Sequence, residues 1–307
     1  MSAGPEQRWA VVVLSWNGKD DTLACLESLA HVEWPRLDVI CVDNASSDGS
    51  PSAIRAWHPS VTLIENASNL GFSGGNNVGI RAAFERGAAW VLLLNNDATL
   101  APDAIAELDA VARARSSAGI LGGKVLFADP PDLIWFAGQR FHAALGYSGR
   151  PRGYRKPDGP EYGGVQPVDR VVGACMAVSR RLADTVGLLD EDLFAYVEDV
   201  DWSLRAREAG FEVLLVPRAR AWHRVGASTG GERASSTAVY YGVRNMIVVC
   251  ERHRPLPLGL RELRRLVIAS TFAATVALGE ARGPRLRAVV EGVQDARRGR
   301  LGLRGHA

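Results

Sequence analysis

Cysteine is scarce in this chain, and several common sequence patterns are missing. The four cysteines, Cys25, Cys41, Cys175 and Cys250, form no CxxC pair, and three of them lie in apolar surroundings. This usage is typical of reduced core residues in a cytosolic protein and shows no zinc-site pattern. No internal repeat is present. No Gly-Lys-Ser/Thr follows a glycine-rich turn, which excludes a P-loop nucleotide site.

Long hydrophobic runs are also missing. Residues 1–18 have no basic segment followed by an apolar run, so we expect no signal peptide. The apolar stretch 266–278 is too short to span a bilayer as a helix. At 307 residues, the chain is long enough for one large α/β domain with an appendage or for two modest domains. We expect a cytoplasmic protein, free or at the inner face of the plasma membrane, without a nucleic-acid partner.

Charge is distributed unevenly along the chain. Residues 251–307 carry 12 Arg against 5 acidic residues, a net +7, so the remainder sums to −5. This basic segment alternates apolar and basic groups. It is therefore expected to be a helical C-terminal extension of a main domain at 1–250. Its basic face is either solvated or in contact with anionic lipid head groups. The sequence also leaves open whether the protein forms a homodimer.

Strands and helices alternate along the first 97 residues. Apolar runs predict strands within 9–17, 36–50, 61–66 and 89–97. Helical spacing predicts helices at 19–32, 51–59 and 74–88, the last of them after a glycine-rich turn. This order implies βαβ units and an α/β fold with a parallel sheet.

Polar clusters stand where three of these strands end. In parallel sheets, ligands bind outside the carboxyl ends of the strands. A carboxylate at such an end, with a histidine from elsewhere, suits Mg²⁺ or Mn²⁺. The three clusters are Ser15-Trp16-Asn17, Asp43-Asn44 and Asn95-Asn96-Asp97.

The second half of the chain holds two further candidate regions. Residues 128–169 are rich in Gly, Pro and aromatics and too long for an idle connection, which favours a substrate-facing loop or a small hairpin layer. Farther on, Glu198, Asp199 and Asp201 open a predicted helix. Helix capping and the helix dipole would explain these acids. Their crowding equally suits a carboxylate kept as a catalytic base.

Six blocks together resemble family 2 glycosyltransferases with the GT-A fold, in the bacterial rhamnosyltransferase-like branch. The resemblance implies a mixed, mostly parallel sheet and an inverting, metal-dependent transfer of a sugar, such as rhamnose. The donor would be a nucleoside-diphosphate-sugar, with dTDP or UDP favoured. The acceptor would be a hydroxyl of a glycan, a lipid-linked glycan or a natural product. The blocks are 11–29, 38–50, 69–83, 91–100, 197–223 and 240–247, within residues 9 to about 250.

The same resemblance assigns roles to individual residues. Asp97 and His223 would hold the Mg²⁺ or Mn²⁺, and Asp199 would be the catalytic base. The first acid of the family's DxD-type motif is Asn95 here, which leaves Asp97 as the carboxylate for the metal. Donor contacts are expected from Ser15, Trp16, Asn17, Asp43, Asn69, Gly71, Asn76, Asn96 and Arg244, and acceptor-side contacts from Glu198, Gly173, Ala174 and Trp202.

Two other readings compete with this one. A nucleotide- or glycan-binding module that has lost activity would keep the fold, although the presence of Asp97, Asp199 and His223 together argues against it. A serine hydrolase is the second, because residues 71–75 fit G-x-S-x-G. That elbow must leave a strand directly, whereas residues 65–70 intervene, so the match is attributed to chance.

Overall fold

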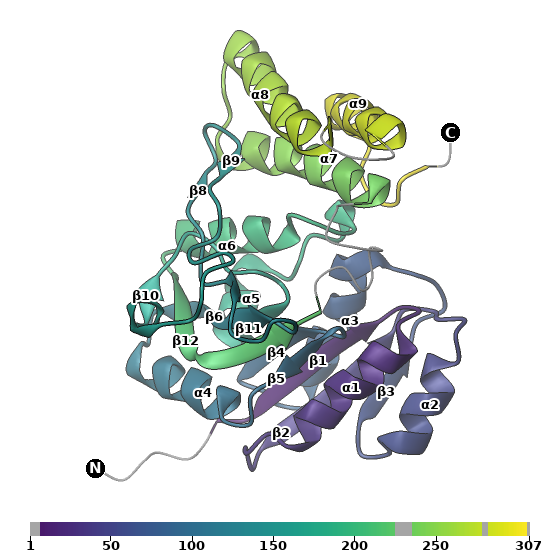
Figure 1. Ribbon diagram of the computed structural model, residues 1–307, viewed down its shortest axis with the longest axis vertical. Coiled ribbons are helices and arrows are strands. Elements are labelled where there is room, and N and C mark those ends of the chain that lie inside the picture. Colours follow the sequence, from purple (N-terminus) through teal and green to yellow (C-terminus); the bar gives the residue numbers. More distant parts are fainter. Residues whose placement is uncertain (1–6, 225–234, 278–281, 306–307) are drawn as a thin grey trace.

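The structure is a computed structural model that describes residues 7–224, 235–277 and 282–305 (Figure 1). Its strands are β1 (Trp9–Ser15), β2 (Leu37–Asp43), β3 (Thr62–Glu65), β4 (Trp90–Asn95), β5 (Ala98–Leu100), β6 (Ala118–Phe127), β7 (Ile134–Phe136), β8 (Phe141–His142), β9 (Tyr147–Ser148), β10 (Gln166–Pro167), β11 (Cys175–Ser179) and β12 (Glu212–His223). Its helices are α1 (Lys19–Ala30), α2 (Ser50–Trp57), α3 (Gly71–Glu85), α4 (Ala104–Ala114), α5 (Arg180–Val186), α6 (Glu198–Glu208), α7 (Ser236–His253), α8 (Leu258–Ala277) and α9 (Arg282–Arg298).

One mixed sheet forms the centre of the molecule, in the order β10-β12-β6-β11-β4-β1-β2-β3. The strands β3, β2, β1 and β4 are parallel, so their carboxyl ends meet at one edge. Residues 9–13 and 91–94 are buried, as expected for apolar strands covered on both faces. The predicted alternation of strands and helices over the first 97 residues is confirmed.

The strand β11 runs antiparallel between β4 and β6, which makes the sheet mixed. Cys175, at its start, pairs with Leu94 near the end of β4. The preceding residue, Ala174, accepts a hydrogen bond from the backbone N–H of Asn95 at 3.2 Å. This reversal brings the Gly173-Ala174 segment to the sheet edge where β4 delivers its polar cluster.

The glycine-rich stretch 71–75 belongs to a helix, so the predicted turn before residue 74 is wrong. The helix α3 begins at Gly71, whose φ is +73° and whose missing Cβ would collide with the Phe194 carbonyl oxygen. Farther along, a Cβ at Gly75 or Gly79 would overlap Leu14 or Val12 of β1. These glycines therefore let the helix approach the sheet closely.

Short strands occupy the segment 128–169, in agreement with the hairpin-layer reading. Here β7 pairs with β6, β10 pairs with β12, and β8 forms a separate hairpin with β9. Gly146, at the hairpin turn, packs against Ile268 of α8. The segment thus connects the sheet to the C-terminal helices.

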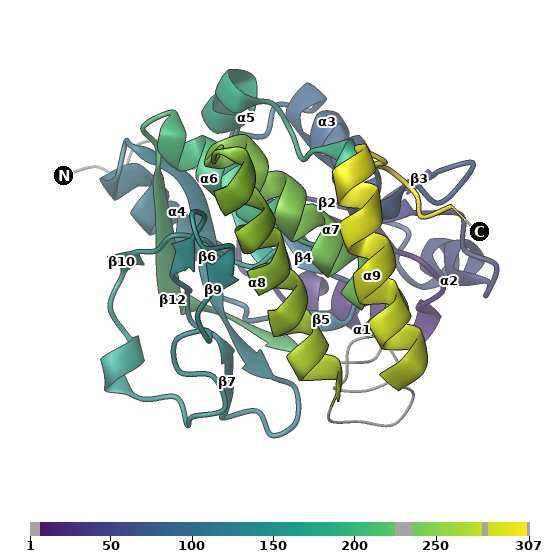
Figure 2. The same ribbon diagram turned by 90° about the horizontal axis from the view of Figure 1, so that it is seen from above.

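The helices α7, α8 and α9 stack on one another at one end of the molecule (Figure 1). Seen from above, α8 and α9 lie side by side as an outer layer over α7 (Figure 2). They enclose a second apolar cluster, which includes Tyr240, Val243, Ile247, Ile268 and Val289. The expected boundary at residue 250 falls inside α7. No helix in the described ranges combines the length and apolarity that a membrane span requires.

Candidate active site

A cavity of about 590 Å³ opens beside the carboxyl end of β4. Its walls come from the segment after β4, the end of β12, the start of α6, and the helices α7 and α8. It brings together six of the predicted site residues, which are Asp97, Gly173, Ala174, Glu198, Asp199 and His223.

Asp97 and His223 form the polar centre of this cavity. The Asp97 Oδ1 and His223 Nε2 atoms lie 2.8 Å apart, and both side chains are buried. The Asp97 Oδ1 atom nevertheless accepts no hydrogen bond. The imidazole is packed against Trp135, with ring centroids 4.6 Å apart, and Asn95 Nδ2 lies 3.4 Å from its Nε2.

This pair suits a divalent cation. A buried carboxylate oxygen without a hydrogen bond and an imidazole nitrogen beside it are groups that would both ligate one ion such as Mn²⁺ or Mg²⁺. The described residues contain no cluster of three or more His, Cys, Asp or Glu side chains placed to share a metal. Among the described residues, Asp97 and His223 would therefore be the two ligands, with other positions left to substrate and water.

Asp199 also lines the cavity and is held by several hydrogen bonds. Arg170 Nη1 contacts both of its carboxylate oxygens, at 3.0 and 3.1 Å. The backbone N–H groups of Gly173 and Val200 also donate to it. Gln139 accepts a hydrogen bond from Arg170 Nε at 2.6 Å and so fixes the guanidinium.

Glu198 has a different environment from its neighbour. It is buried, and its Oε2 atom lacks a hydrogen-bond partner. Burial, reinforced by the charge of Asp199, raises the pKa of Glu198 to about 8. The carboxyl group of Glu198 therefore favours its protonated form at neutral pH, because burial disfavours the charged form.

The backbone leading into α6 is strained. Phe194, Tyr196 and Val197 all have positive φ, between 64° and 73°, a conformation that non-glycine residues adopt rarely. Asn245 of α7 holds this segment, because its Nδ2 atom lies 2.7–2.8 Å from the carbonyl oxygens of Leu193, Ala195 and Tyr196. The position of the Glu198-Asp199 pair therefore depends on α7.

The prediction that Arg244 contacts the donor diphosphate is wrong. Its side chain is fully buried beneath the strained segment and does not line the cavity. It donates to the carbonyl oxygens of Gly302 and Leu193, and its guanidinium lies against the ring of Tyr241. A buried charge requires such partners, and here they are structural.

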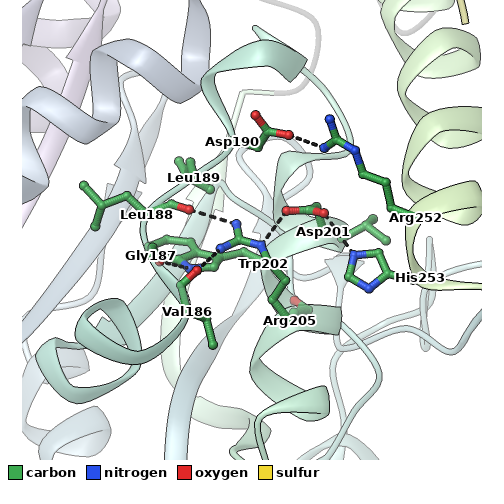
Figure 3. Close-up of polar contacts among 12 residues, drawn as sticks. Val186, Gly187, Leu188, Leu189, Asp190, Asp201, Trp202, Arg205, Arg252 and His253 are labelled. Atoms are coloured by element: carbon green, nitrogen blue, oxygen red, sulfur yellow. Dashed lines mark hydrogen bonds and ion pairs between the residues drawn. The ribbon is translucent and has the colours of Figure 1, made fainter. Parts of the chain in front are cut away.

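A second network anchors the other side of α6 (Figure 3). Asp201 accepts hydrogen bonds from Arg205, at 2.7 Å, and forms an ion pair with His253 at the end of α7, at 3.0 Å. The predicted acceptor-side role of Trp202 is wrong, because this side chain lies in the main core with its indole N–H donated to the Gly187 carbonyl. Aromatic residues of this size contribute most when fully buried.

Three of the predicted donor residues stand at the carboxyl ends of β1 and β2, outside the lining of the cavity. Asp43 is buried, with Oδ2 accepting from the Ser46 N–H and Oδ1 without a partner. Trp16 is 56% exposed, and Asn17 accepts from the Ser47 N–H. A buried carboxylate oxygen without a partner and an exposed aromatic ring, at the ends of two paired strands, are groups that a nucleoside can contact.

The remaining predicted donor residues form hydrogen bonds with neighbouring groups at or near the carboxyl edge of the sheet. The Ser15 Oγ and Asn96 Nδ2 atoms both contact the Thr22 hydroxyl, at 2.9 and 3.0 Å. Asn69 accepts from the Gly71 N–H and closes the turn into α3. Asn76, expected to contact the donor, is buried inside α3, where its Nδ2 atom donates to the Phe72 carbonyl, and it does not line the cavity.

The structure contradicts the serine-hydrolase alternative. Ser73 is fully buried inside α3, not on an elbow after a strand. Three residues that the sequence reasoning missed line the cavity, namely Trp135, Arg170 and Tyr196. Trp135 belongs to the aromatic-rich segment 128–169, which was expected to face substrate, and Arg170 follows this segment directly. That proximity was the only sequence signal for these two residues.

A mixed, mostly parallel sheet flanked by helices, with a cavity beside the carboxyl end of β4, agrees with the GT-A fold of glycosyltransferases. The comparisons with known proteins agree with this class. The model for glycosyltransferase-like family 2 matches residues 5–242, and the chain belongs to that family. It is therefore an enzyme of sugar transfer.

Relatives in sequence include rhamnosyltransferases. The chain is 31% identical over 251 residues to the N-acetylglucosaminyl-diphospho-decaprenol L-rhamnosyltransferase of Mycobacterium tuberculosis, covering 74% of this chain and 79% of that one. It is 25% identical to the dTDP-rhamnosyl transferase RfbF of Shigella flexneri, covering 85% and 86%.

Similarity to solved structures supports the fold. A mannosyltransferase of Pyrobaculum calidifontis in complex with GDP-Man and Mn²⁺ superposes with a TM-score of 0.59 at 16% identity, over 95% of this chain and 87% of that chain. GalNAc-T7 with UDP, GalNAc and Mn²⁺ gives a TM-score of 0.62 at 16% identity, over 86% and 55%.

Proposed function

We propose that this enzyme transfers a sugar, rhamnose in the first instance, from a dTDP-sugar to a hydroxyl of a lipid-linked glycan, with inversion. The observation that carries the proposal is one cavity lined by the Asp97-His223 pair, whose Asp97 Oδ1 atom accepts no hydrogen bond, and by Asp199. The choice of dTDP and rhamnose rests on the names of the relatives.

On the donor side, Asp97 and His223 would hold Mg²⁺ or Mn²⁺. When bound, the ion offsets the negative charge that develops on the departing nucleoside diphosphate. Trp16 would stack on the base, and the free Oδ1 atom of Asp43 would accept a hydrogen bond from the base or ribose. Asn96 lies next to the same edge and would contact the ribose.

On the acceptor side, Asp199 would act as the base. The acceptor oxygen forms a bond to the anomeric carbon as the bond from that carbon to the diphosphate oxygen breaks. The hydroxyl proton passes to the Asp199 carboxylate, which must lie within about 3 Å of it. Arg170 holds this carboxylate in place, and Gly173 and Ala174 leave room for the acceptor ring.

A lipid-linked acceptor also agrees with the apolar part of the cavity. Met246 of α7 and Phe272 of α8 line the wall next to the catalytic groups. The basic segment 251–307 would then bring the enzyme to an anionic membrane on its cytoplasmic face. The relative from Mycobacterium tuberculosis is named for a decaprenol-linked acceptor.

Nucleotide binding tests the proposal. A ligand that binds only the folded state raises the melting temperature, so we expect dTDP with Mn²⁺ to stabilise the protein more than either alone. Asp97→Asn should abolish this cooperation, whereas Asp132→Asn, the same chemical change at an exposed site, should retain it. Equal stabilisation of wild type and Asp97→Asn by dTDP and Mn²⁺ would contradict the assignment. Metal-dependent binding without sugar transfer would instead favour the inactive binding module.

A further inference from the structure

We infer that the outer face of α8 and α9 is a docking surface for an anionic phospholipid bilayer. The inference rests on the proposed membrane-linked acceptor. It names the surface that brings the enzyme to that acceptor. The argument comes from an unusual distribution of arginine and leucine on α8.

The helix α8 points its arginines inward. Arg264 and Arg265 are nearly fully buried, whereas Leu263 and Leu266, which flank them in sequence, are each more than half exposed. Arg265 forms ion pairs with Glu251 and Glu262, at 2.6 Å each, and Arg264 donates to the Arg254 carbonyl at 2.7 Å. Because the inward arginines have specific partners, the helix is fixed with its leucines outward.

The outward face of α8 carries no charge. Its residues recur at intervals of three and four, which places them on one side of the helix. Charged groups on a free, solvated helix normally occupy this outer side. The face consists of Leu260, Leu263, Leu266, Val267, Thr271 and Ala274, all exposed.

The neighbouring helix α9 extends this face and adds cations. Leu286 and Val290 are exposed on it, along with Arg282, Arg287 and Arg298. No acidic group among the described residues forms an ion pair with these three arginines. The helices α8 and α9 lie side by side as the outer layer (Figure 2), so the exposed apolar residues of α8 and the free arginines of α9 belong to adjacent helices.

This combination fits a bilayer surface better than a second copy of the chain. Interfacial helices bury an apolar face at the boundary of head groups and acyl chains while basic side chains meet lipid phosphates. Two copies joined through the same face would instead oppose their unpaired arginines, and like charges repel. The net charge of +7 over residues 251–307 strengthens this choice.

The docking surface and the catalytic cavity share α8. Phe272 projects from this helix into the cavity wall, next to Gly242 and Met246 of α7. A membrane bound to the outer face would therefore lie one helix layer from the acceptor side of the cavity. An acceptor whose lipid stays in that membrane could present its sugar to Asp199 from this side.

Sedimentation of the full chain with vesicles tests the inference. The vesicles contain either phosphatidylcholine alone or phosphatidylcholine with phosphatidylglycerol. We expect binding to the anionic vesicles only. The triple variant Leu263→Ser/Leu266→Ser/Val267→Ser should weaken it by about tenfold or more. Arg287→Gln/Arg298→Gln should weaken it by about fivefold per arginine, with greater sensitivity to salt. Trp57→Ser, which removes an exposed aromatic side chain from α2, is the matched control and should bind as wild type.

Two further measurements separate the possible failures. Metal-dependent dTDP binding should be unchanged in all these variants, so a lost vesicle interaction with intact nucleotide binding supports the surface independently of the proposed reaction. Light scattering measures the oligomeric state. A wild-type dimer that the triple leucine and valine variant converts to a monomer would overturn the inference and assign the face to a second copy. Equal vesicle binding by wild type and the triple variant would also overturn it.

Discussion

Replacing Asn245 by alanine tests how α7 controls the catalytic carboxylates. Asn245 is fully buried, and its Nδ2 atom contacts the carbonyl oxygens of Leu193, Ala195 and Tyr196. These residues lie in or next to the strained segment with positive φ at Phe194, Tyr196 and Val197. Without the amide, the carbonyl oxygens of Ala195 and Tyr196 lose this donor, that of Leu193 keeps only its other donors, and the strained segment loses its restraint.

The expected magnitude follows from these contacts. A buried polar group left without a partner costs about 1–3 kcal/mol, and the amide serves several. We therefore expect a loss of about 3 kcal/mol in the free energy of unfolding. The segment leads directly into Glu198 and Asp199, and a displacement of about 1 Å at a catalytic group can lower the rate by about 100-fold. The kcat should fall by this order, while the donor KM should change little because Asp97 and His223 lie on other elements.

The assay combines urea unfolding with steady-state kinetics well below the melting temperature. Asn77→Ala is the matched control, because Asn77 is also a buried amide that binds backbone, at Leu189, but it does not hold residues 194–197. It should lose stability and keep kcat. If Asn245→Ala is destabilised but retains the wild-type kcat, then α7 does not position Asp199 and the reasoning fails.

Two predictions concern pH. The pKa of Glu198 is raised to about 8, so the stability that its protonated form contributes is present below the unfolded value of 4.5 and is lost as pH rises toward 8. The stability of Glu198→Gln should therefore rise relative to wild type between about pH 5 and pH 8. A difference in melting temperature that stays constant over this range would refute the prediction. Burial lowers the pKa of His253, but hydrogen bonds with Asp201 and Glu208 outweigh burial and raise the pKa above 6.5. Protonated His253 therefore stabilises the fold at low pH, and this stabilisation is lost as pH rises through the pKa of the folded state. His253→Gln should destabilise the protein more at about pH 6 than at about pH 9, as measured by thermal unfolding, and the opposite order would contradict the ion pair with Asp201.

The polar edge of the sheet could be predicted because it depends on short, local sequence patterns. Apolar runs that end in polar clusters mark the carboxyl ends of parallel strands, and these ends must meet. Asp43 and Asp97 could be placed there from the sequence. The pairing of Asp97 with His223 could not be derived this way, since 126 positions separate them; it was expected only from the resemblance to a family.

Residues whose roles depend on tertiary contacts could not be assigned from the sequence. Arg244 was expected at the diphosphate, yet its charge is satisfied by carbonyl oxygens that only the fold brings near. Trp202 follows the acidic cluster in sequence, but the core takes up its large ring. Arg170 has no motif of its own, and its contact with Asp199 depends on the antiparallel insertion of β11. The inward arginines of α8 likewise contradict the usual expectation for a basic helix.

The most direct measurement of the central claim is a single-turnover assay of Asp199→Asn with dTDP-rhamnose, Mn²⁺ and a lipid-linked acceptor. The amide keeps the size of the carboxylate but accepts the hydroxyl proton poorly, so we expect metal-dependent donor binding as in wild type and sugar transfer lowered by about 10²-fold or more. Transfer by Asp199→Asn at the wild-type rate would remove Asp199 from the reaction and contradict the account.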